Sequence, residues 1–300
     1  MANLYTYQSS NIRRTWGLFI VFFIVIIVLG WVFSEAYGTP DFLIFAVIFS
    51  IAYSLISYYS SASIALSLAR AKPIEKSDNP QLYNIVENLC ITAGLPMPKL
   101  YVTPELQINA FATGRDKDHA AVAVTQGALQ RLNKDELQGV LAHELSHVGN
   151  RDILVSTVAA ILAGIIALVA DIFLRSVFLG GAGIGRGRND EAGEIFLIVA
   201  IVLSILAPIG TMLIQLAISR RREALADASG VLLTRYPEGL ISALQKIEVD
   251  TTPMRTAKDS TAHMWIDTPF KGKGTSWWHK IFMTHPPIEE RIAALQKFSG

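Results

Sequence analysis

The stretch at residues 141–170 reads LAHELSHVGNRDILVSTVAAILAGIIALVA. Its beginning is polar and holds two histidines and a glutamate, whereas its last eighteen residues carry no charge. An uncharged run of this length approaches the roughly 20 residues that cross a bilayer as a helix. The stretch therefore predicts a chemically active helix at the mouth of a membrane segment.

The composition of the whole chain also points to a membrane. Of 300 residues, 51% are hydrophobic and 17% are charged, whereas soluble domains usually carry about 25% charged residues. The lipid bilayer is thus an expected partner, and the net charge of +1 predicts no binding to nucleic acid. The single cysteine, Cys90, cannot form an internal disulfide, and its apolar helical surroundings predict that it is buried.

Four long apolar runs predict two hairpins of transmembrane helices, because each run approaches or exceeds the length of a span. They cover residues 15–34, 42–69, 153–170 and 195–218. Arg13 and Arg14 precede the first run, as they would in a signal peptide. Its apolar core is longer than the roughly 7–15 residues of a signal peptide, and no clear cleavage site follows. We therefore expect a retained helix.

Lysine and arginine residues mark the cytoplasmic ends of membrane helices. The marked ends carry Arg13, Arg14, Arg70, Lys72, Lys76, Arg151, Arg220, Arg221 and Arg222. The turn at 35–41 has neither residue type, whereas the loop at 176–194 contains Arg186 and Arg188 and is a mild exception. The balance predicts that both termini and residues 71–152 lie in the cytoplasm.

The polar segments predict a domain of mixed helices and strands. Helical spacing of apolar residues and alternation typical of strands give the expected elements. Helices are expected over 80–93, from Lys134, over 238–248 and over 287–298, and strands over 99–102, 108–114 and 119–126. Asn133 should cap the helix that begins at Lys134. Trp265, Trp277 and Trp278 are expected either at the lipid interface or in the core.

His143, Glu144 and His147 form the pattern H-E-x-x-H within the helix that begins at Lys134. Residues four apart lie on one helical face, so the two imidazoles can hold one metal ion. Glu144 can then take a proton from a water molecule that the ion polarises. The pattern alone is weak evidence, because a solvated helix end with incidental histidines would look the same.

A zinc peptidase needs a third protein ligand besides two histidines. No third histidine follows at short spacing, because VGNRD occupies that place. Further along, SRRREALADASG at 219–230 places Glu223 and Asp227 four apart on one helical face. Glu223 can bind a metal while Asp227 orients a ligand histidine, although either carboxylate could in principle reach the ion. The arginines of this segment are equally explained as a topology signal.

The spacing of both motifs from the apolar runs predicts that they meet. His147 is six residues before Ile153, or about 9 Å along a continuous helix. Glu223 is five residues past Ile218, or about 7 Å by the same rise. The third helix leaves this membrane face and the fourth returns to it. The hairpin is therefore expected to bring the two motifs together at one depth.

HELSH at 143–147, SRRREALADASG, INAFATG at 108–114 and THPPIEERIAAL at 284–295 together resemble the HtpX family of membrane zinc metalloproteases. These proteases are relatives of the CAAX prenyl endopeptidases, and the resemblance covers nearly the whole chain. It implies an α+β membrane protein with four transmembrane helices and a gluzincin-like cytoplasmic metalloprotease domain. It also implies one Zn²⁺ held by His143, His147 and Glu223, with Glu144 as general base and acid.

The implied protease domain is split by a transmembrane hairpin. Along the chain we expect an N-terminal transmembrane hairpin at 1–70, followed at 71–152 by the first part of the protease domain with the H-E-x-x-H helix. The second transmembrane hairpin is expected at 153–218, and the second part of the protease domain, with the third zinc ligand, at 219–300.

The resemblance implies cleavage of membrane or misfolded proteins, in stress-linked quality control in a bacterial plasma membrane, with the active site on the cytoplasmic side. A prenyl-protein processing peptidase would use the same chemistry, but four spanning helices are too few for the enclosed chamber of such relatives. A non-enzymatic membrane scaffold is the alternative of another class, and it would need no stoichiometric zinc. The sequence sets neither the natural substrate nor the oligomeric state.

Two further positions match the family's motifs. Asn109 lies in INAFATG, which resembles the family's edge strand beside the cleft. Such a strand can bind an extended substrate by adding it to the sheet, but an ordinary core strand explains the segment equally well. His285 in THPP could donate to a developing oxyanion or cap the last helix.

Overall fold

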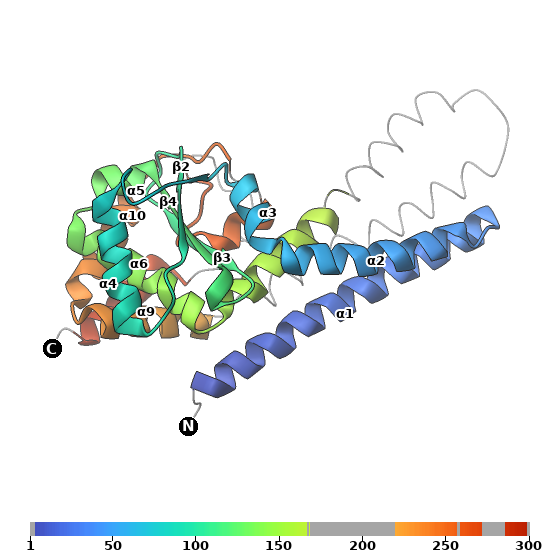
Figure 1. The fold of residues 1–300 in the computed structure, drawn as a ribbon, viewed down its shortest axis with the longest axis horizontal. Helices are drawn as coiled ribbons and strands as arrows, with labels where there is room; N and C mark the ends of the chain where they lie inside the picture. The colour runs from blue at the N-terminus through green and yellow to red at the C-terminus, as the bar shows by residue number, and fades with distance from the viewer. Residues whose placement is uncertain (1–3, 167, 169–219, 257–258, 272–285, 299–300) are drawn as a thin grey trace.

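The computed structural model describes residues 4–166, 168, 220–256, 259–271 and 286–298. Figure 1 shows two parts: a long pair of helices, α1 (Leu4–Tyr37) and α2 (Asp41–Tyr59), and a rounded domain of helices around a small sheet. The fourth apolar run, the connection at 171–194 and the residues His285, Trp277 and Trp278 lie outside the described part of the chain.

The helix pair is the first predicted membrane hairpin. α1 holds the candidate span Ser10–Trp31 with mean hydropathy 2.2, and α2 is the candidate span Asp41–Tyr59 with mean hydropathy 2.0. The two helices pack against one another, and they converge toward the turn that joins them (Figure 1). A Cβ atom added to Gly30 would lie 2.3 Å from the Cβ of Ala46, so only glycine allows this approach. Two of the four predicted spans are thus present as whole helices of sufficient length.

The second apolar run is not a single helix, contrary to the sequence prediction. α2 ends at Tyr59, and α3 (Ser61–Leu68) begins after Ser60, whose φ of −104° and ψ of 10° are not helical. Ala65 and Leu66 of α3 are buried in a cluster against the sheet. Packing against the sheet therefore places the end of this run in the polar domain, although its hydropathy alone suggested one long span.

The sheet has four strands in the order β1-β2-β4-β3. They are β1 (Lys72–Pro73), β2 (Lys99–Thr103), β3 (Ala110–Gly114) and β4 (Ala120–Thr125). β2 and β4 run parallel, and the other two pairs are antiparallel. The predicted strands are confirmed, and β3, which carries most of INAFATG, lies at the edge of the sheet.

The predicted helices of the polar domain are also confirmed, and α6 lies at their centre. They are α4 (Pro80–Ala93), α6 (Lys134–Gly149), α9 (Arg220–Thr234), α10 (Pro237–Val249) and α12 (Ile288–Leu295). The structure adds the helix α5 (Gln126–Arg131), which was not predicted, and short 3₁₀ turns at Lys117–His119, Asp259–Met264 and Gln296–Phe298. α6 contacts α4, α9, α10 and β3. It begins as predicted at Asn133, which forms a capping box with Glu136. The cap fixes where the helix starts, and its packing against these neighbours determines which face of the helix is buried.

The helix after α6 does not continue it, so the rise calculated for a continuous helix is wrong. The helix Asp152–Ile166 makes an angle of 85° with α6 across a short break. Arg151 adopts a left-handed backbone with φ of 59°, which ends regular helix geometry for a non-glycine residue. The new helix packs against α1 instead. The histidines therefore lie at a sharp corner of the chain, not on the membrane helix itself.

The structure shows the surroundings of two residues, Trp265 and Asn109, for which the sequence left two interpretations open. Trp265 is 2% exposed and meets the ring of Phe111 edge-on at 4.6 Å, so it is a core residue. Asn109 is buried and binds the segment after Trp265, because its amide donates to the Asp267 carbonyl at 2.9 Å. Asn109 therefore anchors this segment beside the start of β3.

Candidate metal centre

α6 brings both histidines of the H-E-x-x-H pattern to one buried face. His143 is fully buried and Glu144 is 3% exposed. The Nε2 atoms of His143 and His147 lie 3.2 Å apart, as residues one helical turn apart allow. The alternative interpretation, a solvated helix end with incidental histidines, therefore does not agree with the structure.

α9 brings a carboxylate to the same point. Glu223 Oε2 lies 3.7 Å from His143 Nε2, and Glu223 Oε1 lies 3.6 Å from His147 Nε2. α9 can come this close to α6 because Gly230 faces it: an added Cβ there would lie 3.1 Å from the backbone nitrogen of His143. The one potential ligand atom of each of the three residues lies within 4.8 Å of the other two.

These three residues fit a single zinc ion. Zinc binds histidine nitrogen and carboxylate oxygen at about 2.0–2.2 Å, so two ligand atoms of one ion lie no more than about 4.4 Å apart. The three separations between His143, His147 and Glu223 are 3.2, 3.6 and 3.7 Å. Two imidazoles with one carboxylate are also a donor set that suits zinc.

Each histidine is oriented by a carboxylate on its other ring nitrogen. Asp227 Oδ1 lies 2.9 Å from His143 Nδ1, and Asp152 Oδ2 lies 3.0 Å from His147 Nδ1. A carboxylate accepts only, so in the neutral imidazole that binds a metal each Nδ1 would carry the hydrogen and each Nε2 would keep its lone pair for an ion. Sequence reasoning found Asp227 but missed Asp152. At five positions after His147, Asp152 would point about 140° away on a continuous helix, and only the break at Arg151 returns it.

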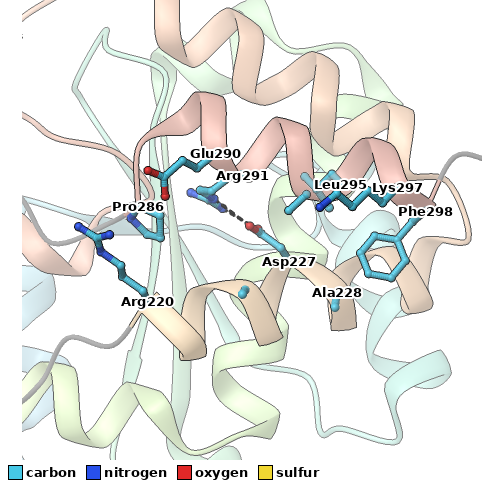
Figure 2. A pocket seen from close by; sticks show the side chains of 11 residues that line it. Arg220, Asp227, Ala228, Pro286, Glu290, Arg291, Leu295, Lys297 and Phe298 are labelled. Carbon is cyan, nitrogen blue, oxygen red and sulfur yellow. Dashed lines mark hydrogen bonds and ion pairs between the residues drawn. The ribbon is translucent and has the colours of Figure 1, made fainter.

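Arg291 on α12 holds Asp227 in place. Its Nε and Nη2 atoms donate to the two oxygens of Asp227 at 2.9 and 2.7 Å, and Figure 2 shows the two side chains facing one another. Burial disfavours the charge of Asp227, but Arg291 and His143 hold the pKa of this carboxyl well below its usual range. The pair also forms part of the wall of a cavity of about 480 Å³ between α9 and α12 (Figure 2). Sequence reasoning missed Arg291, although it lies in THPPIEERIAAL.

The electrostatic environment of the site is negative. Burial lowers the pKa of His147, but the charges of Glu223, Asp152 and Glu144 outweigh it and raise this pKa to about 9. The same carboxylates would attract a divalent cation. Zinc needs a neutral imidazole, so its binding would release the proton that His147 otherwise holds.

Glu144 lies beside His143 in α6 and differs from the neighbouring carboxylates in its contacts. The residue is 3% exposed, and within the described residues we find no hydrogen bond or ion pair that engages its carboxylate. The neighbouring carboxylates Asp152 and Asp227 are, by contrast, fully engaged by their partners. Glu144 is therefore the carboxylate of this group that remains available for proton transfer.

Comparison with known proteins agrees with a membrane-bound protease. Residues 76–299 match the model of Peptidase family M48, and the chain belongs to this family. The protease HtpX homolog of Caldanaerobacter subterraneus subsp. tengcongensis is 47% identical over 298 residues, which are 99% of this chain and 98% of that protein. The HtpX homolog of Thermoanaerobacter pseudethanolicus is 44% identical over 299 residues, again 99% of this chain and 98% of the relative. The resemblance to the HtpX family is thereby confirmed.

Among solved structures, the crystal structure of S. mikatae Ste24p is similar with a TM-score of 0.49 and 18% sequence identity. The likeness covers 97% of this chain and 66% of that chain.

Proposed function

We propose that this membrane-bound protease is a zinc metalloendopeptidase in which His143, His147 and Glu223 hold one Zn²⁺. The observation that carries the proposal is the convergence of their three ligand atoms within 4.8 Å of one another, with His143 and Glu223 buried and His147 half-buried. When bound, zinc acts as a Lewis acid that polarises the scissile carbonyl and the attacking water. Asp227 and Asp152 keep both imidazoles in the tautomer that leaves Nε2 free.

Glu144 is proposed as the general base and acid. It follows His143 directly in α6 and is buried without a hydrogen-bond partner among the described residues. In this position Glu144 takes a proton from the attacking water and then delivers it to the leaving amine.

The substrate is proposed to bind as an extended strand along β3. The Ala110 carbonyl accepts a hydrogen bond from the Ile266 amide at 3.1 Å, which identifies the outer edge of β3. Alternate residues turn their backbone groups to the same edge, so Ala112 and Gly114 face outward too. An extended peptide can pair with these groups by strand addition.

The remaining parts of the proposal concern the membrane. We propose four spans, with the second hairpin at 153–218, a plasma-membrane location and an active site on the cytoplasmic side. The two candidate spans in α1 and α2 support this arrangement, as do the lysine and arginine positions. Membrane or misfolded proteins are the proposed substrates, cleaved in stress-linked quality control.

The substitution Glu144→Gln tests this chemistry. The amide is nearly isosteric but cannot accept the proton, so cleavage of a model membrane protein should fall by about 10²–10⁴-fold. Zinc content, measured on the same purified samples, should stay at one ion per chain. Undiminished cleavage by this variant would refute the assigned role of Glu144.

Removal of the metal provides the matching control. A chelator should abolish cleavage by the wild-type protein, and added Zn²⁺ should restore it. His143→Ala should purify without stoichiometric zinc. A wild-type protein that cleaves the substrate with no bound metal would exclude the metalloprotease proposal.

A further inference from the structure

The first candidate membrane helix contacts Asp152, the residue that orients the proposed ligand His147. Asn11 lies near the start of the candidate span Ser10–Trp31, at the end of α1 that begins beside the polar domain (Figure 1). It is a polar residue only 3% exposed. A buried amide is costly unless it is hydrogen-bonded, so its partners indicate why it is there.

The Asn11 amide binds the corner of the chain that follows α6. Its Nδ2 atom donates to Asp152 Oδ1 at 2.6 Å and to the Asn150 carbonyl at 3.1 Å. The other oxygen of Asp152 lies 3.0 Å from His147 Nδ1. Two consecutive hydrogen bonds therefore connect α1 to His147.

A second buried side chain completes this polar cluster. Arg222 Nη1 donates to Asn11 Oδ1 at 3.4 Å, and its Nε lies 3.7 Å from Asp152 Oδ1. Arg222 immediately precedes Glu223 on α9. The cluster thus joins α1, α9 and the segment after α6, and it lies beside two of the three proposed metal ligands.

Asp152 needs this support to orient an imidazole. A carboxylate can rotate about its Cβ–Cγ bond, and only a fixed plane directs one lone pair of Oδ2 at His147. Asn11 makes the short contact to the opposite oxygen, Oδ1, whereas Arg222 is 3.7 Å from that atom. Asn11 is therefore the stronger restraint on the plane of this carboxylate.

We propose that Asn11 is a positioning residue for the metal ligand His147 and acts through Asp152. The first membrane helix would then help to set the geometry of the metal centre. The inference rests on the proposed zinc site. Loss of a group that orients a ligand typically weakens metal binding or activity by about 10–100-fold. Asn11 acts one hydrogen bond further out, so Asn11→Ala should weaken zinc binding by about 10-fold, the lower end of that range.

The test measures zinc affinity of the full chain in detergent, by competition with a chromogenic chelator. Thr15→Val is the matched control. Thr15 is one helical turn further along α1 and is equally buried, and within the part of the chain that the structure describes its hydroxyl donates to the Asn11 carbonyl of its own helix. Asn11→Ala should bind zinc about 10-fold more weakly, and Thr15→Val should bind it as the wild type does. Equal affinities for all three proteins would overturn the inference.

A reversal of the hydrogen bond distinguishes positioning from simple loss of packing. Asn11→Asp alone sets two carboxylates against one another and should weaken zinc binding at least as much as Asn11→Ala. Combined with Asp152→Asn, the new amide at position 152 can donate to the new carboxylate at position 11 and still accept from His147. The double variant should regain zinc affinity relative to Asn11→Asp, and no recovery would contradict a positioning role.

The visible absorption of the Co²⁺-loaded protein is the second readout, because it reports ligand geometry and not merely folding. Asn11→Ala should change this spectrum, whereas Thr15→Val should not. The two proposals fail in different ways. A wild-type protein without stoichiometric zinc would refute the zinc site itself. A zinc-binding wild type with an unaltered Asn11→Ala variant would refute only the inference about α1.

Discussion

Glu223 and Asp227 differ in which nitrogen of His143 they reach. Glu223 Oε2 lies 3.7 Å from Nε2, whereas Asp227 Oδ1 lies 2.9 Å from Nδ1. Nε2 is also the atom nearest to His147, so it is the side of the ring where an ion would bind. Asp227 faces away from that point and is bound by Arg291. The geometry therefore favours Glu223 as the ligand and Asp227 as the orienting group.

This difference predicts different metal contents for two variants. Glu223→Ala leaves two protein ligands, and we expect it to purify with little zinc and no activity. Asp227→Ala leaves all three ligands, and the loss of an orienting group typically costs about 10–100-fold, so excess zinc should restore part of its activity. Metal analysis and cleavage assays on both purified variants provide the measurement. Loss of metal from Asp227→Ala with retention by Glu223→Ala would mean that the third ligand is misassigned.

Among the residues of the candidate site, the sequence predicted those that lie within short sequence motifs. His143, Glu144 and His147 belong to one short motif, and Glu223 and Asp227 belong to another. Residues that reach the site through tertiary contacts carried no such signal. The amide of Asn11 meets Asp152 across 141 residues, and Arg291 meets Asp227 across 64 residues. Their roles depend on the packing of α1 and α12, which no local pattern specifies.

Among the elements, α6 is the helix that the rest of the polar domain surrounds. Its packing depends on Gly139, where an added Cβ would lie 2.7 Å from the backbone nitrogen of Leu240 and 2.8 Å from its Cα. These are backbone atoms of α10, so they cannot move aside as a flexible side chain would. Gly149 in the same helix has only the Leu95 side chain near, at 3.8 Å.

Alanine at these two glycines should therefore affect the melting midpoint differently. Gly139→Ala gains about 1 kcal/mol of helix propensity, but the overpacking it causes costs about 1–3 kcal/mol, and we expect a lower melting midpoint. Gly149→Ala meets only ordinary contacts and should melt at the wild-type temperature or above it. Thermal unfolding of both variants in the same detergent gives the comparison. Equal midpoints would show that α10 can withdraw from α6 at little cost.

The sequence predicted the elements of the polar domain better than the course of the apolar runs. Periodicity and the Asn133 cap placed α6 correctly because both are local properties. Hydropathy indicates that a run is buried but not whether lipid or protein buries it. The run at 42–69 therefore divides at Ser60, and the chain turns at Arg151 where a straight helix was expected.

For the whole molecule, the main question is which side of the membrane holds the protease domain. The polar domain adjoins one end of the α1–α2 pair (Figure 1), so the site lies at a membrane surface if these helices span. The lysine and arginine residues around the four apolar runs predict that this surface is cytoplasmic. The hydrogen bonds from Asn11 then tie the site to the cytoplasmic end of the first helix.

Cysteine labelling in intact cells tests this orientation. Cys90 is buried, and burial raises the pKa of its thiol to about 11, so it should react poorly, but it is first replaced by alanine. Single cysteines are then introduced at Ser77, which is exposed in the polar domain, and at Asn189, between the third and fourth apolar runs. A membrane-impermeant thiol reagent should label only the variant at position 189, and lysis of the cells should make position 77 reactive. Labelling of position 77 alone in intact cells would mean that the protease domain lies outside the cytoplasm.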